Sequence, residues 1–127
     1  MSPIAGETTM LRCEVEAHGR AAIVHVAGEI DMSNAGEFAL FLRRATAFGQ
    51  HVIVNMTHVL YVDGRGLHAL REAEHECQRR RRRLMVAGAV PIVRRVMGIV
   101  RLDKTISCVD SVEEALQVLR TLSNGAD

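Results

Sequence analysis

Short apolar runs alternate with amphipathic helical stretches along most of this chain of 127 residues. The short runs are rich in valine and isoleucine and are typical of buried strands, whereas the longer stretches repeat their apolar residues every three or four positions. After an opening pair of strands, helices and strands alternate in the order ββαβαβαβα. Such alternation makes neighbouring strands parallel, with helices packed on the sheet. The sequence therefore predicts a single α/β domain with a mixed, mostly parallel sheet.

The expected strands lie at 11–17, 21–28, 52–54, 84–87 and 105–109. The first two are joined by a short turn at 18–20 and should form an antiparallel hairpin. Residues 57–62 are expected to loop out of the third strand. Each later strand is reached through a helix and should run parallel to the one before it.

Local end signals place the four expected helices. Ser33 or Asn34 can cap the first, with Glu37 three residues after Asn34, and Gly49 closes it. The second begins at 63–66, the third has Pro91 in its first turn, and 111–114 forms a capping box for the fourth. Residues 1–9 should form a flexible leader and 123–127 a flexible tail, so the domain is expected to span 10–122.

The overall charge argues against a general attraction to nucleic acid or to membranes, because the formal net charge is only +1. No apolar run approaches the roughly 18–20 residues that cross a bilayer, so no membrane insertion is expected. The start of the chain lacks the features of a secretory signal, and its three widely spaced cysteines are typical of free thiols. These features favour a cytoplasmic location.

Five consecutive arginines at 79–83 are a local exception to this charge balance. They follow the second expected helix, where cations complement the negative end of the helix dipole, and a solvated helix end is the favoured interpretation. A patch for an acidic protein partner is the alternative. No helix-turn-helix pattern accompanies the run, so direct binding to nucleic acid is not expected.

No constellation of residues predicts an enzyme. A nucleotide-phosphate loop and a nucleophile elbow are absent, and 64–66 has two glycines but not the third of a dinucleotide fingerprint. The six histidines are not spaced as metal ligands and Cys77 falls on an apolar helix stripe, so no metal or cofactor is predicted. Asp31 and Asp63 follow strands and should lie at the same end of the sheet, each holding a loop or capping a helix.

Four segments resemble motifs of the STAS-domain family, the anti-sigma factor antagonists. Residues 26–31 (Val-Ala-Gly-Glu-Ile-Asp) resemble a strand end of that family. Residues 52–67 resemble its most diagnostic stretch, which ends in Asp-Ser-Ser-Gly-Leu. Residues 84–97 and 111–116 are similar to its later segments. The four motifs occur in order across roughly residues 11–122.

The resemblance implies the STAS fold and a regulatory function in transcription. Members of this family release a sigma factor by binding its anti-sigma factor, which is often a serine kinase. That kinase abolishes binding by phosphorylating the second serine of the motif, because the phosphate adds nearly two negative charges at the docking surface. This chain is therefore expected to act as an anti-anti-sigma factor and to bind its partner through Asp31, Ser33, Asn34, Asp63, Gly64, Arg65 and Gly66.

The chain departs from the family motif at the switch itself, where Gly64 and Arg65 occupy the two serine positions. Arginine is not a substrate for a serine kinase, so no phosphorylation is expected there. A cation near a helix start is slightly unfavourable, and Asp31 and Asp63, if close as the resemblance implies, would offset it. Asn55 replaces an aspartate of the family, with a minor effect expected on the neighbouring loop.

Three consequences of Arg65 compete. The protein is a constitutive antagonist, or it recognises a different partner with an acidic patch, or it is regulated at another hydroxyl, for which Ser33, Thr57 and Ser107 are available. We favour the first two together, which describe a phosphorylation-independent binding protein.

An accessory subunit of a transport complex, such as the cytoplasmic component of a lipid-transport ATPase, or another non-sigma signalling scaffold, is the alternative function. A third option, weak nucleotide binding, has no supporting motif. The chain is expected to be a monomer or a weak homodimer, the latter through the edge strand at 11–17.

Overall fold

The computed structural model describes residues 11–126 and contains one five-stranded sheet with the spatial order β1-β2-β3-β4-β5. Strands β1 (Leu11–His18) and β2 (Ala21–Ile30) form the expected antiparallel hairpin. Strands β3 (His51–Val62), β4 (Leu84–Ala87) and β5 (Ser107–Val109) continue the sheet in parallel with β2. The predicted mixed sheet is confirmed, whereas the predicted leader at 1–9 lies outside the described residues.

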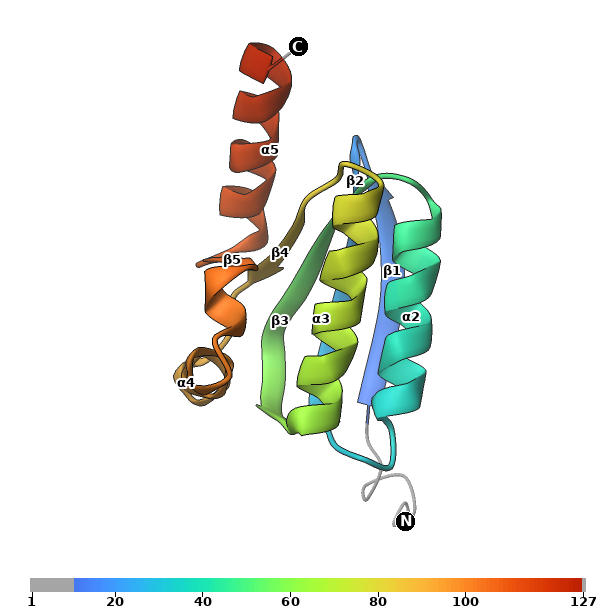
Figure 1. The fold of residues 1–127 in the computed structure, drawn as a ribbon, viewed down its shortest axis with the longest axis vertical. Helices are drawn as coiled ribbons and strands as arrows, with labels where there is room; N and C mark the ends of the chain where they lie inside the picture. The colour runs from blue at the N-terminus through green and yellow to red at the C-terminus, as the bar shows by residue number, and fades with distance from the viewer. Residues whose placement is uncertain (1–10, 127) are drawn as a thin grey trace.

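Helices cover the two faces of the sheet unequally (Figure 1). Helices α2 (Ala35–Ala47) and α3 (Gly64–Arg79) lie side by side on one face, and α4 (Pro91–Ile99) packs near β3 before a 3-10 turn, η1 (Leu102–Lys104). Helix α5 (Val112–Ala126) lies against β4 and β5 from the other face. No helix within residues 11–126 is long and apolar enough to cross a membrane.

Two apolar cores follow from the alternation of side chains along the strands. The larger core lies beneath α2, α3 and α4 and includes Val24, Val54 and the fully buried Phe38. The smaller core lies beneath α5 and receives the intervening residues of the same strands, such as Ile23 and Ile53. Because α5 packs on β4, β5 and part of β3, most of the β1–β2 hairpin carries a helix on one face only.

The prediction that 57–62 loops out of the third strand is wrong, because β3 runs without a break from His51 to Val62. Its second half stays paired with β2 through two register shifts, between His25 and Ala27 and between Gly28 and Glu29. Bulges of this kind break the strict alternation of buried and exposed residues that the sequence would otherwise display. The final strand is shorter than predicted, because η1 occupies the chain before it and β5 begins only at Ser107.

All four helices begin where the sequence predicts, and α2 differs only in that Asn34 occupies the cap position without a capping hydrogen bond from its side chain. Helix α3 begins after the capping Asp63, α4 has Pro91 in its first turn, and Ser111 Oγ accepts a hydrogen bond from the Glu114 amide (3.1 Å) at the start of α5. The Glu114 carboxylate accepts from the Asp110 amide (3.0 Å), one residue before the donor that a capping box uses. The expected domain boundary at 122 falls inside α5.

Candidate functional site

The turn between β2 and α2 is held by Asp31, whose carboxylate Oδ1 accepts hydrogen bonds from the Ser33 hydroxyl (2.6 Å) and the Ser33 amide (2.9 Å). These bonds, above all the one from the hydroxyl, hold the pKa of Asp31 below its ordinary value. Ser33 lies in the turn rather than at the helix cap, and its side chain is exposed. Both predicted residues therefore lie at the surface, already bound to each other.

Asn34 occupies the cap position of α2, but the predicted capping by its side chain is wrong. Its Oδ1 accepts from the Asp31 amide (3.0 Å) and its Nδ2 donates to the Glu29 carbonyl (2.9 Å), so the side chain turns back toward the end of β2. Only 5% of Asn34 is exposed. We therefore assign Asn34 to positioning the turn, because a buried amide has little surface to offer a partner.

Asp63 and Gly66 fix the start of α3 on the ends of β2 and β3. Asp63 Oδ1 accepts hydrogen bonds from the amides of Arg65 (3.0 Å) and Gly66 (3.2 Å), as expected of a helix cap. The Asp63 amide donates to the Ile30 carbonyl (3.0 Å), which ties the end of β3 to the end of β2. The expectation that Asp31 and Asp63 follow strands at the same end of the sheet is confirmed, because Ile30 and Val62 are register partners.

Arg65 is exposed in the first turn of α3, next to the exposed Gly64. The expected compensation by Asp31 and Asp63 does not take the form of an ion pair. Both carboxylates accept hydrogen bonds from neighbouring amides, and no carboxylate in residues 11–126 lies within ion-pair distance of the Arg65 guanidinium. The charge at this helix start is therefore available to a partner.

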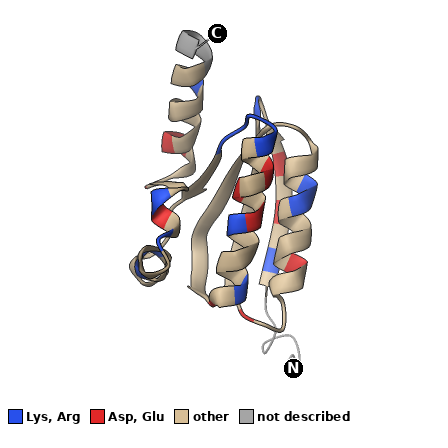
Figure 2. Cartoon of the chain, viewed as in Figure 1, with Lys and Arg blue, Asp and Glu red and all other residues tan. Residues whose placement is uncertain are grey.

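A groove of about 780 Å³ runs between α2 and α3 and begins at Gly64 and Arg65. Small apolar residues form its lining, because alanines occupy positions 35, 39, 69 and 73 along the facing helices. Charged residues border it, and Figure 2 shows basic residues at both ends of α3 and both acidic and basic residues along its middle. The bordering residues are Arg43, Arg65, His68, Glu72, Glu76 and Arg80.

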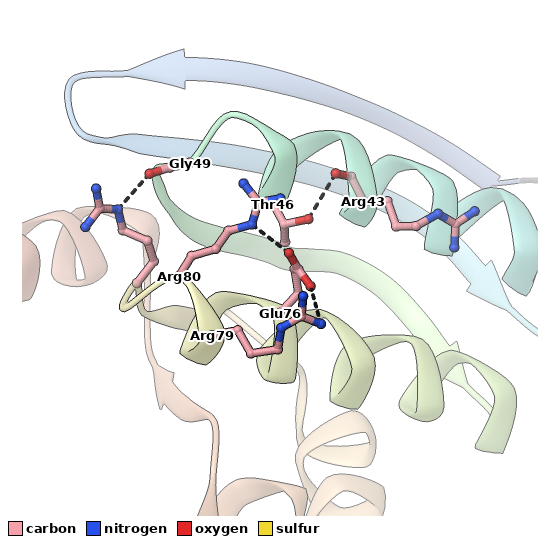
Figure 3. Close-up of polar contacts among 7 residues, drawn as sticks. Arg43, Thr46, Gly49, Glu76, Arg79 and Arg80 are labelled. Atoms are coloured by element: carbon pink, nitrogen blue, oxygen red, sulfur yellow. Dashed lines mark hydrogen bonds and ion pairs between the residues drawn. The ribbon is translucent and has the colours of Figure 1, made fainter.

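The far end of this groove is lined by Glu76 and by Arg80 of the arginine run, whose contacts Figure 3 shows. Glu76 binds both Arg79 Nη1 (3.2 Å) and Arg80 Nε (2.6 Å), and the hydrogen bond from Arg80 lowers the pKa of Glu76. Arg82 Nε donates to the Gly49 carbonyl (2.6 Å), which joins the end of α3 to the end of α2. Several of these arginines thus hold the end of the helix, in agreement with the favoured interpretation of the run.

Three exposed apolar side chains near the start of α3 are not among the partner-binding residues predicted from the sequence. Met32 in the β2–α2 turn is 67% exposed, and Leu60 and Tyr61 near the end of β3 are 64% and 46% exposed. They belong to the same end of the sheet as Arg65, because Tyr61 pairs with Glu29 and Met32 follows two residues after Ile30. Exposed apolar residues beside a charged group are typical of a protein-binding surface.

Asn55 lies on the sheet face that carries α5, within a chain of hydrogen bonds. Its Nδ2 donates to His25 Nδ1 (3.0 Å), while its Oδ1 accepts from the Thr57 hydroxyl (2.7 Å). His25 Nε2 in turn contacts Glu16 (2.7 Å). The Thr57 hydroxyl is packed against Gly88, where an added Cβ would lie 2.2 Å from Thr57 Oγ1. Of the three hydroxyls considered as other regulatory sites, two are therefore already engaged, Thr57 with Asn55 and Ser33 with Asp31.

The histidine, cysteine and acidic side chains that could bind a metal ion do not come together in the described part of the chain. Within residues 11–126, no group of three or more histidine, cysteine or acidic side chains is arranged to hold a metal ion. Cys77 is 1% exposed in the larger core, where burial raises the pKa of its thiol to about 12. This agrees with its interpretation as a small core residue.

Known structures share this fold. An anti-sigma factor antagonist from Mycobacterium paratuberculosis superposes with a TM-score of 0.80 at 24% identity, over 87% of this chain and 94% of that chain. The anti-sigma factor antagonist SpoIIAA in its unphosphorylated form gives 0.69 at 18% identity, over 86% and 98%. A sulfate transporter family protein from Wolinella succinogenes gives 0.71 at 20% identity, over 82% and 88%. At these identities the likeness establishes the fold alone.

A model of the STAS domain matches residues 12–115, which is most of the chain. A search of curated proteins gives no significant match. The matched span runs from the edge strand β1 into α5 and includes both the capped start of α3 and the β2–α2 turn, so the chain belongs to the STAS-domain family.

Proposed function

We propose that this protein is an anti-sigma factor antagonist that binds its partner at the start of α3 without control by serine phosphorylation. The observation that carries the proposal is the exposed Arg65, which has no ion-pair partner within residues 11–126 and stands at the position of the family's switch serine. The antagonist names of the Mycobacterium and SpoIIAA structures support the general kind of function.

The expected partner surface is acidic and partly apolar. The exposed guanidinium of Arg65 favours negative charge opposite it, while the amides of the helix start are already bound by the Asp63 carboxylate. Met32, Leu60 and Tyr61 offer apolar contact area around that charge. Ser33 contributes at the edge of this surface, whereas Asn34 and Gly66 are buried and act by holding the turn and the helix start.

Binding of each anti-sigma factor encoded in the same genome to the purified chain, measured by isothermal titration calorimetry, tests the proposal. Arg65→Glu should weaken the complex by at least about tenfold, because it turns an attraction to an acidic partner into a repulsion. Arg120→Glu is the matched control, since Arg120 is exposed on α5 at the opposite face and should leave the affinity unchanged. Equal affinity of wild type and Arg65→Glu for the partner would refute the assigned surface.

Phosphorylation is tested with the cognate kinase and ATP. Intact-mass and peptide mass spectrometry should find no phosphate on residues 57–67 of the wild type. Arg65→Ser restores a hydroxyl at the same position and serves as the control that the kinase is active and can reach the site. A phosphate on any wild-type residue of this segment contradicts phosphorylation-independent binding.

An accessory role in a transport complex is the second candidate, and the likeness to a sulfate transporter family protein is the observation that favours it. Affinity purification of the chain from its native cells distinguishes the two. Recovery of permease or ATPase subunits, together with no binding to any anti-sigma factor in the calorimeter, would replace the proposed function by the transport role.

A further inference from the structure

Strand β1 is an edge of the sheet, and within residues 11–126 it pairs with β2 alone (Figure 1). Its side chains alternate strictly. Leu11, Cys13 and Val15 are half-buried and pack against the larger core, whereas Arg12, Glu14 and Glu16 are exposed on the other face. An edge strand with a half-covered apolar row and free backbone groups is a template for another strand.

The apolar row continues onto the outer side of α2. Cys13 lies near Glu37, and burial of its thiol, together with the charge of Glu37, raises the pKa of that thiol to about 11. Phe41 stands one helical turn after Glu37 on the same side, half-buried, with the Arg44 guanidinium 5.1 Å from its ring centre. Phe48 follows at the end of the helix and is 56% exposed. The edge of the molecule therefore carries an apolar strip that the chain itself leaves partly uncovered.

The charges on β1 are complementary to those of a second β1 in one register. In an antiparallel pair centred on Cys13, Arg12 lies opposite Glu14 of the partner subunit, and Leu11 lies opposite Val15 of the partner subunit. The two-fold axis repeats both pairs. Centring the pair on Arg12 places the two arginines directly opposite each other, which is unfavourable. Centring it on Glu14 places the two Glu14 side chains opposite each other and sets Arg12 opposite Glu16, whose carboxylate already contacts His25. Neither Arg12 nor Glu14 has an ion-pair partner within residues 11–126.

We propose that a second copy of this chain docks at the β1 edge, so that the two β1 strands pair antiparallel about a two-fold axis at Cys13 and the sheet continues across the dimer. Opposite residues of such a pair share a face, so both α2 helices lie on the same side and the two apolar strips meet. This surface is separate from the start of α3, and the dimer stands or falls independently of the proposed partner.

Thiol cross-linking of the full chain reads out the register. Oxidation with copper–phenanthroline at alkaline pH, where the thiolate of Cys13 is more abundant, should give a covalent dimer that Cys13→Ser abolishes. In the Cys13→Ser background, Arg12→Cys mixed with Glu14→Cys should give a disulfide-linked heterodimer, and neither variant alone should cross-link with itself. Self-cross-linking of Glu14→Cys, or no cross-link in the mixture, overturns this register.

Sedimentation velocity over a concentration series tests the charge pairing. Glu14→Arg should weaken dimerisation by about tenfold, because both symmetric ion pairs become repulsive. The double variant Arg12→Glu/Glu14→Arg restores opposite charges and should return the dimer to within about threefold of the wild type. If the wild type stays monomeric over the whole concentration series, the proposal is wrong. The charged side chains on β1 would then serve to keep this edge solvated.

Discussion

Replacing Gly66 by alanine should destabilise the fold although the residue lies in the first turn of a helix. An ideal Cβ at this position would lie 2.5 Å from Val62 Cγ2 and 2.7 Å from Ile30 Cγ2. Carbon atoms prefer separations of about 3.5–4.0 Å, so the helix start or the strands must give way by about 1 Å. Ile30 and Val62 are 0% and 1% exposed, and their branched side chains have little rotamer freedom with which to yield.

Two opposing effects set the change in the free energy of unfolding that Gly66→Ala should cause. Overpacking a core typically costs about 1–3 kcal/mol. Alanine recovers at most about 1 kcal/mol over glycine in a helix. The added Cβ meets two buried side chains at 2.5 and 2.7 Å, so the upper part of the overpacking range applies, about 2–3 kcal/mol. Less the helix gain of about 1 kcal/mol, Gly66→Ala should lower the free energy of unfolding by about 1–2 kcal/mol. Gly64 is the matched control two residues earlier, because an added Cβ there meets nothing within 4 Å. Gly64→Ala should be more stable than the wild type by about 0.4–1 kcal/mol.

Urea unfolding followed by circular dichroism measures both variants against the wild type with a common slope. The ordering Gly64→Ala above wild type above Gly66→Ala is the expected result. If Gly66→Ala is as stable as Gly64→Ala, then α3 does not approach the ends of β2 and β3 as closely as described. Arg65, the residue before Gly66, would then not be held against the ends of these strands.

Three further predictions concern the cap of α3, the β2–α2 turn and the larger core. Asp63→Ala removes the cap of α3 and should cost about 0.5–2 kcal/mol in the same urea titration. Hydrogen bonds from Ser33 lower the pKa of Asp31, so the folded state binds fewer protons than the unfolded chain in the acid range. The ionised Asp31 therefore stabilises the fold at any pH above the ordinary carboxyl pKa of about 4. This stabilisation is lost as the pH falls through the lower pKa of the folded state. Thermal midpoints of the wild type and of Asp31→Asn should be measured across the acid range. The variant should lack the part of the acid-induced fall in stability that comes from Asp31. Cys77, buried and with its thiol pKa raised to about 12, should react with a disulfide reagent only in urea.

The start of α3 was predictable because its signals are local. Asp63 is followed by a glycine pair and then by apolar residues at helical spacing, and each of these features lies within one turn of the helix end. The prediction for Asn34 failed although its local pattern was equally good. Its amide binds the Glu29 carbonyl and the Asp31 amide instead, and this choice depends on how β2 ends.

The second half of β3 could not be predicted from periodicity. Val59 and Val62 are buried three residues apart, and the apolar Leu60 and Tyr61 between them are exposed, so the pattern fits neither a simple strand nor a helix. The register shifts against β2 produce this spacing, and they are set by a strand that lies thirty residues earlier in the chain. The same shifts explain why the exposed apolar part of the site was missed.

Arg65 is unfavourable for the helix that carries it. A cation in the first turn faces the positive end of the dipole, at a cost of a few tenths of a kcal/mol up to about 1 kcal/mol. The Asp63 carboxylate accepts hydrogen bonds from the amides of that turn, and within residues 11–126 no acid forms an ion pair with the guanidinium. The Asp63 carboxylate therefore offsets the charge of the helix start, and the guanidinium is the group that attracts negative charge from a partner. A phosphoserine at this position would present the opposite sign to the same partner. We therefore expect the partner of this protein to carry an acidic group opposite Arg65.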